Sequence, residues 1–551
     1  MVPYRQPSPP PAPPPPKPRI VRPWVAIAFV ASVALAWGLY VLARHVYYGR
    51  YADRHGVATR QERATAIVRM APGPIPTALP MVGQEGRDPD GYPTKHVDTV
   101  GFRTLLQVRR YRELTAYAEE LQDAFERDPK NEYWPVEFGE AFDSSEADID
   151  ADLDAWVAAT PESFAPYIAR GGHRLGKMVA ARGDRFARET SQQEFTEARS
   201  AGQASVADLE RALALRPKSL SAVRIGINVA RIASDRALLE RMRERGIAIC
   251  DACLLWRGPY IITLTPRWGG SYEKMRAFVA ESPLTRNPRL RVLAGYEDSD
   301  RADLLMSQKK YEEALSLIRG TTERIHHWEF YSTRARALRA LARYDEALAD
   351  LDRANTLRPL VSSILAARAA VQLDRHDYLA AGNDMLIALR CDPTGYGVKS
   401  TYPYTLQGLI YEARQLEKAG QRERALDVMD LARALGPMDP TVQYHQAHIS
   451  LADATTPERI AAVRARAKQN PGDYRALEQL YYALSRQGEW GELPTLWSAY
   501  IAIHPEDGRG FMKRATAYRE LGKKDEALAD AKRACELGNN EGCERSTRSI
   551  E

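Results

Sequence analysis

Cysteine is scarce in this chain, with five residues in 551. Small domains that are held together by disulfides instead of a core carry many more, so that class of protein is excluded. The hydrophobic fraction of 44% and the charged fraction of 27% are those of an ordinary folded protein. The length predicts roughly three or four domains, or one long array of repeats.

Acidic residues are missing from the first 50 positions, which carry six basic residues. The whole chain has a net charge of +5, but without this segment it has 71 basic and 72 acidic residues. A protein that binds nucleic acid needs an excess of basic charge to displace counterions from the phosphates. The neutral body therefore argues against nucleic acid as a partner.

Catalytic motifs are also missing. The sequence has no phosphate-binding loop, dinucleotide fingerprint, nucleophile elbow or metalloprotease helix. His445 and His448 are spaced like helical metal ligands, but no third ligand accompanies them. Cys250 and Cys253 form a C-x-x-C pair outside a thioredoxin-like setting, which indicates a local disulfide or buried thiols. We therefore predict no enzyme, no metal site and no cofactor.

The N-terminus combines a proline-rich tail with an apolar run. Residues 1–23 contain eleven prolines, which favour an extended, disordered tail. Residues 24–43 carry no charge, and a helix of that length spans about 30 Å, the thickness of bilayer hydrocarbon. We predict a single membrane-spanning helix, with a cleaved signal peptide as the alternative. Ala28, Ser32 and Ala36 form a stripe of small residues that would permit homodimerisation.

Helical patterning follows a predicted linker. Residues 64–98 are rich in proline and glycine, which resist helix and strand alike. From Phe102, apolar residues recur every three to five positions as far as Asp128, which predicts one amphipathic helix. No alternating strand pattern of useful length follows. We expect an all-α fold with a membrane helix (24–43), a linker (64–98), a divergent helical domain (102–290), a solenoid (295–541) and a short C-terminal end (542–551).

A 34-residue repeat is clearest in the second half of the chain. In residues 328–361 and 508–541, small side chains occupy offsets 8, 20 and 27, where two antiparallel helices would pack closely. Residues 362–395 continue the scheme, and Ala347 and Ala381 are 34 residues apart. The pattern resembles the tetratricopeptide repeat over about residues 295–541. This resemblance implies a solenoid of helical hairpins that binds other proteins.

Tetratricopeptide solenoids usually present a concave groove that is lined by the first helix of each hairpin, which implies a partner-binding wall here. The lysine and asparagine of the chaperone-type carboxylate clamp are absent from the matching positions, so that ligand class is not supported. The candidate wall residues are Ser332, Arg336 and Arg339 in one unit, and Met512, Thr516 and Arg519 in the last unit.

The region 102–290 is helical but has no clean 34-residue period. Arg267 and Trp268 are candidates for a recognition turn, in which arginine stacks or binds a carboxylate; a tryptophan anchored in the core is the alternative. The acidic run from Asp143 to Asp154 is interpreted as a solvated helix face. The region resembles a proteobacterial family of unknown function, which supplies no activity.

Cys535 and Cys543 occur in an Ala-Cys…Gly-Cys pair that resembles the Sel1-like relatives of tetratricopeptide proteins. The resemblance implies a disulfide that ties one helix to the next, with two reduced thiols as the alternative. Disulfides persist in oxidising compartments. We therefore expect a single-pass protein of the bacterial inner membrane with its body in the periplasm.

The leading functional hypothesis is a non-catalytic scaffold for protein–protein contacts in the bacterial cell envelope. One alternative is an enzyme or ligand-binding activity in residues 102–290, which predicts a cavity with clustered titratable groups there. A second alternative turns the solenoid towards the cytoplasm as a docking platform for a chaperone or secretion system.

Overall fold

The computed structural model describes residues 72–183, 191–451 and 456–548, and these form 25 α-helices and one two-stranded sheet. The predicted all-helical fold is confirmed for this part of the chain. No helix within it is long and apolar enough to cross a bilayer. The predicted tail (1–23) and membrane helix (24–43), with Ala28, Ser32 and Ala36, lie outside the described residues.

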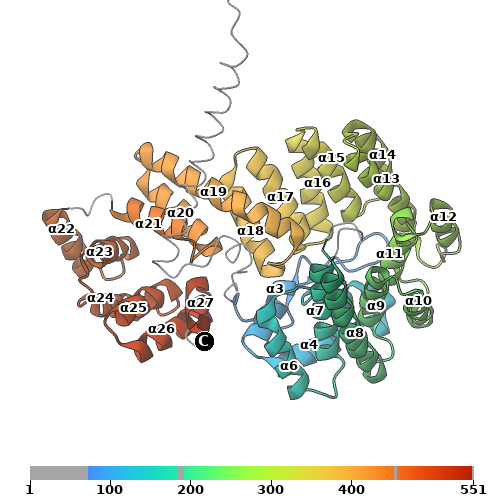
Figure 1. Ribbon diagram of the computed structural model, residues 1–551, viewed down its shortest axis with the longest axis horizontal. Helices are drawn as coiled ribbons and strands as arrows, with labels where there is room; N and C mark the ends of the chain where they lie inside the picture. Colours follow the sequence, from blue (N-terminus) through green and yellow to red (C-terminus); the bar gives the residue numbers. More distant parts are fainter. Residues whose placement is uncertain (1–71, 184–190, 452–455, 549–551) are drawn as a thin grey trace, which may run out of the picture. The chain divides into compact units, whose positions relative to one another are not determined.

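The first half of the described chain folds into helices of uneven length (Figure 1). They are α3 (Thr99–Gln107), α4 (Tyr111–Arg127), α5 (Tyr133–Glu140), α6 (Asp150–Ala159), α7 (Ala165–Arg182), α8 (Gln192–Leu215), α9 (Leu220–Ala233), α10 (Arg236–Cys250), α11 (Leu254–Thr263) and α12 (Tyr272–Ala280).

The second half consists of regular hairpins. Its helices are α13 (Gly295–Ser307), α14 (Tyr311–Arg324), α15 (Trp328–Ala340), α16 (Tyr344–Leu357), α17 (Ser362–Asp374), α18 (Tyr378–Cys391), α19 (Tyr396–Lys418), α20 (Arg422–Leu435), α21 (Pro440–Leu451), α22 (Pro457–Gln469), α23 (Tyr474–Gln487), α24 (Leu493–Ile503), α25 (Gly508–Glu520), α26 (Lys524–Glu536) and α27 (Asn540–Arg548). The hairpins pack in tandem, which is the architecture of a tetratricopeptide-like solenoid.

The single helix predicted from Phe102 to Asp128 is wrong, because the chain turns between α3 and α4. Arg109 adopts a left-handed conformation with φ of 59°, and the amide of Arg110 donates to the carbonyl of Leu105 at 2.9 Å. This is the hydrogen bond of a Schellman turn, which usually contains glycine. Neither glycine nor proline marks this turn, so hydrophobic periodicity alone could not reveal it.

Among the described residues, the same turn joins nine pairs of successive helices, on both sides of residue 290. In each, a residue with positive φ is followed by an amide that donates, over 2.8–2.9 Å, to the carbonyl five positions earlier. The left-handed residues are Arg109, Ser234, Lys309, Ala342, His376, Gly420, Gly488, Gly522 and Gly538. One hydrophobic core cluster also extends from Tyr92 to Phe330. The predicted boundary near residue 290 therefore falls within continuous packing.

The predicted linker differs from the structure over residues 80–98, which pack onto the helical body. The strands β1 (Met81–Val82) and β2 (His96–Val97) pair antiparallel, and Tyr92 and Val97 are buried. The hydroxyl of Tyr92 donates to Glu132 at 3.0 Å. Proline and glycine prevented a helix here, but apolar side chains between them still entered the core.

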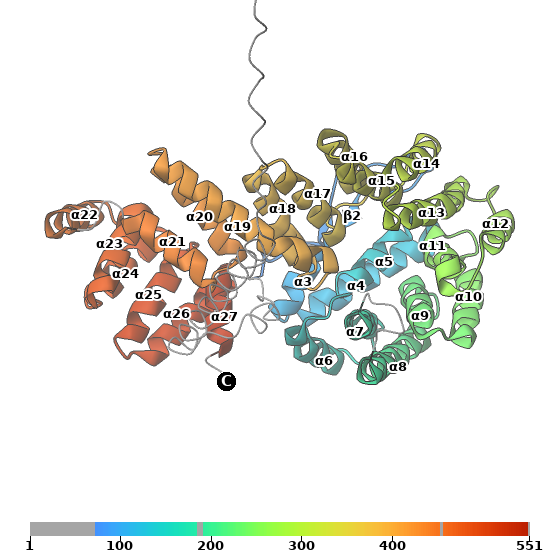
Figure 2. The same cartoon turned by 45° about the horizontal axis from the view of Figure 1, so that its top comes forward.

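The hairpins from α3 to α18 curl back on themselves, so that α3 lies against α18 (Figures 1 and 2). The backbone amide of Ser145 donates to the hydroxyl of Thr394 at 2.9 Å across this closure. The later helices also fold back, since the side chain of Asn540 in α27 donates to the carbonyl of Ala434 in α20 at 2.6 Å.

Candidate functional site

A cavity of about 240 Å³ lies where α5 and α9 face α18 and the end of α16; we call it the closure cavity. Its wall combines carboxylates, arginines, an indole ring and aliphatic side chains from both halves of the chain. The charged and aromatic lining residues include Glu137, Glu140, Asp143, Arg224, Trp328, Arg358 and Asp392, with the thiol of Cys391 beside them.

Four of these charged side chains pair with one another. Arg358, only 4% exposed, contacts Glu137 at 2.9 Å and also forms an ion pair with Glu140. Arg224 contacts the same Glu140 at 2.8 Å. Burial raises the pKa of Glu140, but Arg358 and Arg224 outweigh that effect and lower the pKa below its ordinary value. The four groups therefore join α5 to α9 and α16, and their charges are already compensated.

Asp143, which follows α5, differs from these four because no described basic residue forms an ion pair with it. The loss of surrounding water in the cavity raises the pKa of Asp143 to about 7; the negative charges of Asp392 and Glu140 add to this effect, and the positive charge of Arg224 opposes it. Asp143 is an exposed residue, so water at the mouth of the cavity screens these charges. Asp392 accepts hydrogen bonds from the amide and hydroxyl of Thr394, at 2.9 and 2.7 Å. Two carboxylates from opposite halves thus share one cavity.

This arrangement suits a cationic group better than a metal ion or a covalent reaction. Two neighbouring carboxylates attract a cation, and the face of Trp328 can contribute a cation–π contact. Within the described chain, no group of three or more His, Cys, Asp or Glu side chains is placed to hold a metal. Burial raises the pKa of the Cys391 thiol to about 12, so this thiol is not ionised near neutrality.

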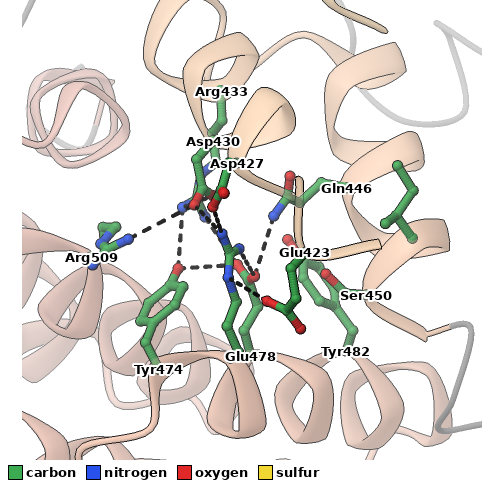
Figure 3. Close-up of polar contacts among 12 residues, drawn as sticks. Glu423, Asp427, Asp430, Arg433, Gln446, Ser450, Tyr474, Glu478, Tyr482 and Arg509 are labelled. Atoms are coloured by element: carbon green, nitrogen blue, oxygen red, sulfur yellow. Dashed lines mark hydrogen bonds and ion pairs between the residues drawn. The ribbon is translucent and has the colours of Figure 1, made fainter. Parts of the chain in front are cut away.

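A second polar cluster lies in the later hairpins and centres on Glu478 of α23 (Figure 3). Glu478 is 1% exposed and accepts hydrogen bonds from Tyr474 at 3.0 Å and Gln446 at 3.2 Å. Arg433 of α20 and Lys513 of α25 contact it at 3.4 and 3.7 Å. Burial raises the pKa of Glu478, but Lys513 and Arg433 outweigh that effect and lower it.

Other charges in this cluster are paired as well. Arg475 contacts Asp427 at 2.7 Å and Asp430 at 3.0 Å, and Figure 3 shows both acids on α20 above the α23 side chains. Burial lowers the pKa of Lys513 to about 8. Because each buried acid has basic neighbours, the cluster holds α20, α21, α23 and α25 together, and we assign it no ligand.

Buried ion pairs also recur within single hairpins. Arg334 forms two parallel hydrogen bonds of 2.6 Å with Asp350, which is 1% exposed. Arg514 makes the same bidentate contact with Asp530 at 2.7 Å, and in both pairs the aspartate follows the arginine by sixteen residues. Arg368 and Asp384 repeat it. The recurring sixteen-residue spacing of arginine and aspartate is the signal of this feature in the sequence, although these residues were not among the predicted site residues.

The predicted wall residues of the first unit lie on one surface but bond to neighbouring hairpins. Arg336 contacts Asp303 of α13 at 2.6 Å, and Arg339 contacts Asp374 of α17 at 2.7 Å. The hydroxyl of Ser332 donates to a carbonyl of its own helix at 2.9 Å. These arginines therefore link successive first helices.

The last unit differs from the prediction. Met512 is 3% and Thr516 is 7% exposed, because α25 packs these positions against neighbouring helices. Neither side chain is therefore accessible to a partner on the surface of the solenoid. The position of a residue within a repeat does not show whether a neighbouring helix will bury it. Arg519 is exposed and contacts Glu520 at 2.6 Å.

The predicted recognition turn lies on the surface. Arg267 contacts Asp300 of α13 through hydrogen bonds of 2.8 and 2.5 Å. Trp268 is 40% exposed, with the guanidinium of Arg231 5.1 Å from its ring centre. The turn is thus held by its own chain, and the tryptophan is not a core anchor.

Both cysteine pairs are bonded in the structure. Cys535 and Cys543 join α26 to α27, with an S–S distance of 2.04 Å. Cys250 and Cys253 are also joined, at 2.06 Å. Cys391 is the free cysteine.

Two family models match parts of the chain. A domain of unknown function (DUF4034) matches residues 99–238, and a tetratricopeptide repeat matches residues 509–540. The second match and the hairpin geometry make this a tetratricopeptide-like protein. No protein with a curated description matches the sequence significantly.

Solved structures with similar helices include the tetratricopeptide domain of P58(IPK). It has 16% identity and a TM-score of 0.20, over 73% of this chain and 93% of that chain. YrrB, titled a tetratricopeptide protein with an unusual peptide-binding site, has 16% identity and a TM-score of 0.14, over 40% and 91%. The TPR2AB domain of yeast Sti1 in complex with pHSP90 has 18% identity and a TM-score of 0.16, over 40% and 82%.

Proposed function

We propose that this chain is a non-catalytic scaffold that binds other proteins, and that the closure cavity holds a basic side chain of a partner. Tandem hairpins of the tetratricopeptide type support protein binding, because such arrays present long surfaces to partners. The observation that carries the proposal is the carboxylate of Asp143: no basic side chain among the described residues forms an ion pair with it, although Glu137 and Glu140 beside it have such partners.

The size and chemistry of the cavity select the group that would enter. A volume of about 240 Å³ is below the range of about 300–1,000 Å³ that is usual for drug-sized ligands, and suits a single long side chain. A guanidinium or ammonium group would neutralise Asp143 and Asp392, while its alkyl stem contacts Leu360 and Val361 of the lining. Arginine is favoured because its planar fork can bind carboxylates bidentately.

The test is the binding of N-acetyl-arginine methylamide to the full-length chain, compared with the uncharged citrulline analogue. We expect the arginine compound to bind at about millimolar concentration and the analogue at least tenfold more weakly. Asp143→Asn should remove this preference, whereas Asp148→Asn, an exposed acid on the same segment, should not. Binding should strengthen from pH 6 to pH 8, since Asp143 must lose its proton.

Equal binding of the two compounds, or an unchanged preference in Asp143→Asn, would exclude the proposal. A second candidate is an enzyme in which Asp143 transfers protons, favoured by a pKa near neutrality in a cavity with clustered titratable groups. An enzyme of that kind would retain binding of the arginine compound in Asp143→Asn but lose turnover of its substrate.

We further propose that residues 24–43 hold the protein in a bacterial inner membrane with its body in the periplasm. The uncharged apolar run supports an anchor, and the two cysteine pairs support an oxidising compartment. The alternative with a cytoplasmic body predicts four reduced thiols at these positions.

A further inference from the structure

A second surface feature is lined by the end of α7, by α8 and by the α9–α10 hairpin; we call it the arginine-rimmed groove. It has a volume of about 590 Å³ and shares no lining residue with the closure cavity. Its floor is formed by Met178, Val229 and Leu238, which are buried, and its accessible apolar surface comes from the half-buried side chains of Phe195, Val206 and Ile232. The groove is therefore a depression with apolar walls over the core and polar side chains at its edges.

Gly202 of α8 shapes this floor. A Cβ atom at this position would lie 3.0 Å from the sulfur of Met178. The absence of a side chain lets α8 approach α7 closely and leaves the depression unfilled above it.

The rim carries an excess of positive charge. Arg199 is exposed and forms no ion pair with a described residue, and Arg241 lies 4.0 Å from Glu210, at the limit of an ion pair. The acidic residue of the lining is Asp235, and its carboxylate accepts a hydrogen bond from the amide of Leu238 at 2.9 Å, where it caps α10. A ligand that fits this groove should therefore be apolar on one face and acidic at its edges.

We propose that the arginine-rimmed groove docks an amphipathic helix of a partner protein, with acidic residues beside its apolar face. Apolar residues at positions i, i+3, i+4 and i+7 would enter the floor, as in other helix-in-groove complexes. Carboxylates on the flanks would meet Arg199 and Arg241. A membrane surface is less suitable, because the body beyond residue 50 is neutral, with 71 basic and 72 acidic residues, and lacks the broad positive field that anionic lipids attract.

The inference names a partner class for the scaffold proposed above and rests on that function. The probe is a fluorescent 14-residue peptide with leucine at i, i+3, i+4 and i+7 and glutamate on its flanks. A twin peptide carries lysine in place of each glutamate. Anisotropy with the full-length chain should show the glutamate peptide binding at least tenfold more tightly, with the difference falling as salt rises.

Variants locate the binding site. Arg199→Glu with Arg241→Glu should reverse the preference between the peptides, and the corresponding double change to lysine should keep it. Val206→Gln, at the half-buried wall of the groove, should weaken binding of the glutamate peptide at least tenfold. Arg319→Glu, an exposed arginine outside the groove, is the matched control and should have no effect.

Equal binding of both peptides, or binding that the rim variants do not change, would overturn the inference. A partner helix would also be the wrong ligand if the short-chain anionic lipid dihexanoyl phosphatidylglycerol bound the groove as tightly as the peptide does. The same conclusion would follow if the groove proved to be the interface through which two copies of the chain associate. Asp143→Asn separates the two proposals, because it should leave peptide binding intact. Binding of the arginine compound without binding of the peptide would reject the groove alone.

Discussion

Asp143 and Glu478 both have charged side chains near them, but these neighbours and burial together shift the two pKa values in opposite directions. Glu478 is 1% exposed and lies near Arg433 and Lys513, which lower its pKa despite burial. Loss of surrounding water raises the pKa of Asp143 to about 7, and the charges of Asp392 and Glu140 add to this effect, while the more weakly acting Arg224 opposes it without forming an ion pair. Removal of one partner from a compensated buried pair is strongly destabilising, whereas a carboxylate without an ion-pair partner in a cavity marks a place where a cationic ligand would add stability.

Replacing Asp143 with asparagine should therefore stabilise the body at alkaline pH. The folded pKa lies above the ordinary value of 3.8, so the folded state loses stability as the pH rises from about 4 to about 7. Because the side chain reaches solvent, we expect a gain of only about 1 kcal/mol for Asp143→Asn at pH 8, shrinking towards zero near pH 4. Chemical unfolding at the two pH values measures this, and a gain of equal size at both would contradict it.

The element that recurs along the chain is the left-handed turn between the two helices of a hairpin. Glycine occupies it at Gly420, Gly488, Gly522 and Gly538, whereas a residue with a side chain, such as Ala342, occupies it at the other positions. A side chain at positive φ brings Cβ close to the following carbonyl, which costs roughly 1–2 kcal/mol. The turn persists because the hydrogen bond from the amide of Arg343 to the carbonyl of Leu338, at 2.9 Å, and helix packing outweigh this cost.

Ala342→Gly should therefore raise the stability of the α15–α16 hairpin. We expect a gain of about 0.5–1 kcal/mol, because relief of the strain exceeds the extra freedom that glycine has in the unfolded chain. Gly522→Ala, the matched reverse change, should lower the stability of the α25–α26 hairpin by about 1 kcal/mol. Hydrogen exchange of the amides in each hairpin reports the effects locally, and the prediction fails if both changes act in the same direction.

At the scale of the whole molecule, contacts between distant segments turn an array of hairpins into a structure with an interior. Arg358 reaches Glu137 across more than 200 residues of chain, and α3 lies against α18. The closure cavity exists only because of this return. The two cysteine pairs, by contrast, are local, and whether they are oxidised depends on the compartment that holds the body.

The proposed periplasmic body predicts the result of thiol counting. Alkylation of denatured protein from intact cells without reductant should modify one cysteine, Cys391, and reduction should make all five available. A phosphatase fused to the C-terminus should be active, and a fluorescent reporter that folds only in the cytoplasm should stay dark. Five modified cysteines without reductant, together with fluorescence, would favour the cytoplasmic alternative.

The all-helical class, the tandem hairpins and the cysteine spacings could be read from the sequence, because they depend on side chains within one hairpin. The helix break at Arg109, the packing of residues 80–98 and the burial of Met512 depended on distant contacts, so local periodicity could not reveal them. The same reason applies to the site. Asp143 looks like a solvated acid beside others, and only the tertiary structure decides that Arg358 neutralises Glu137 and Glu140 while Asp143 faces Asp392 in a cavity.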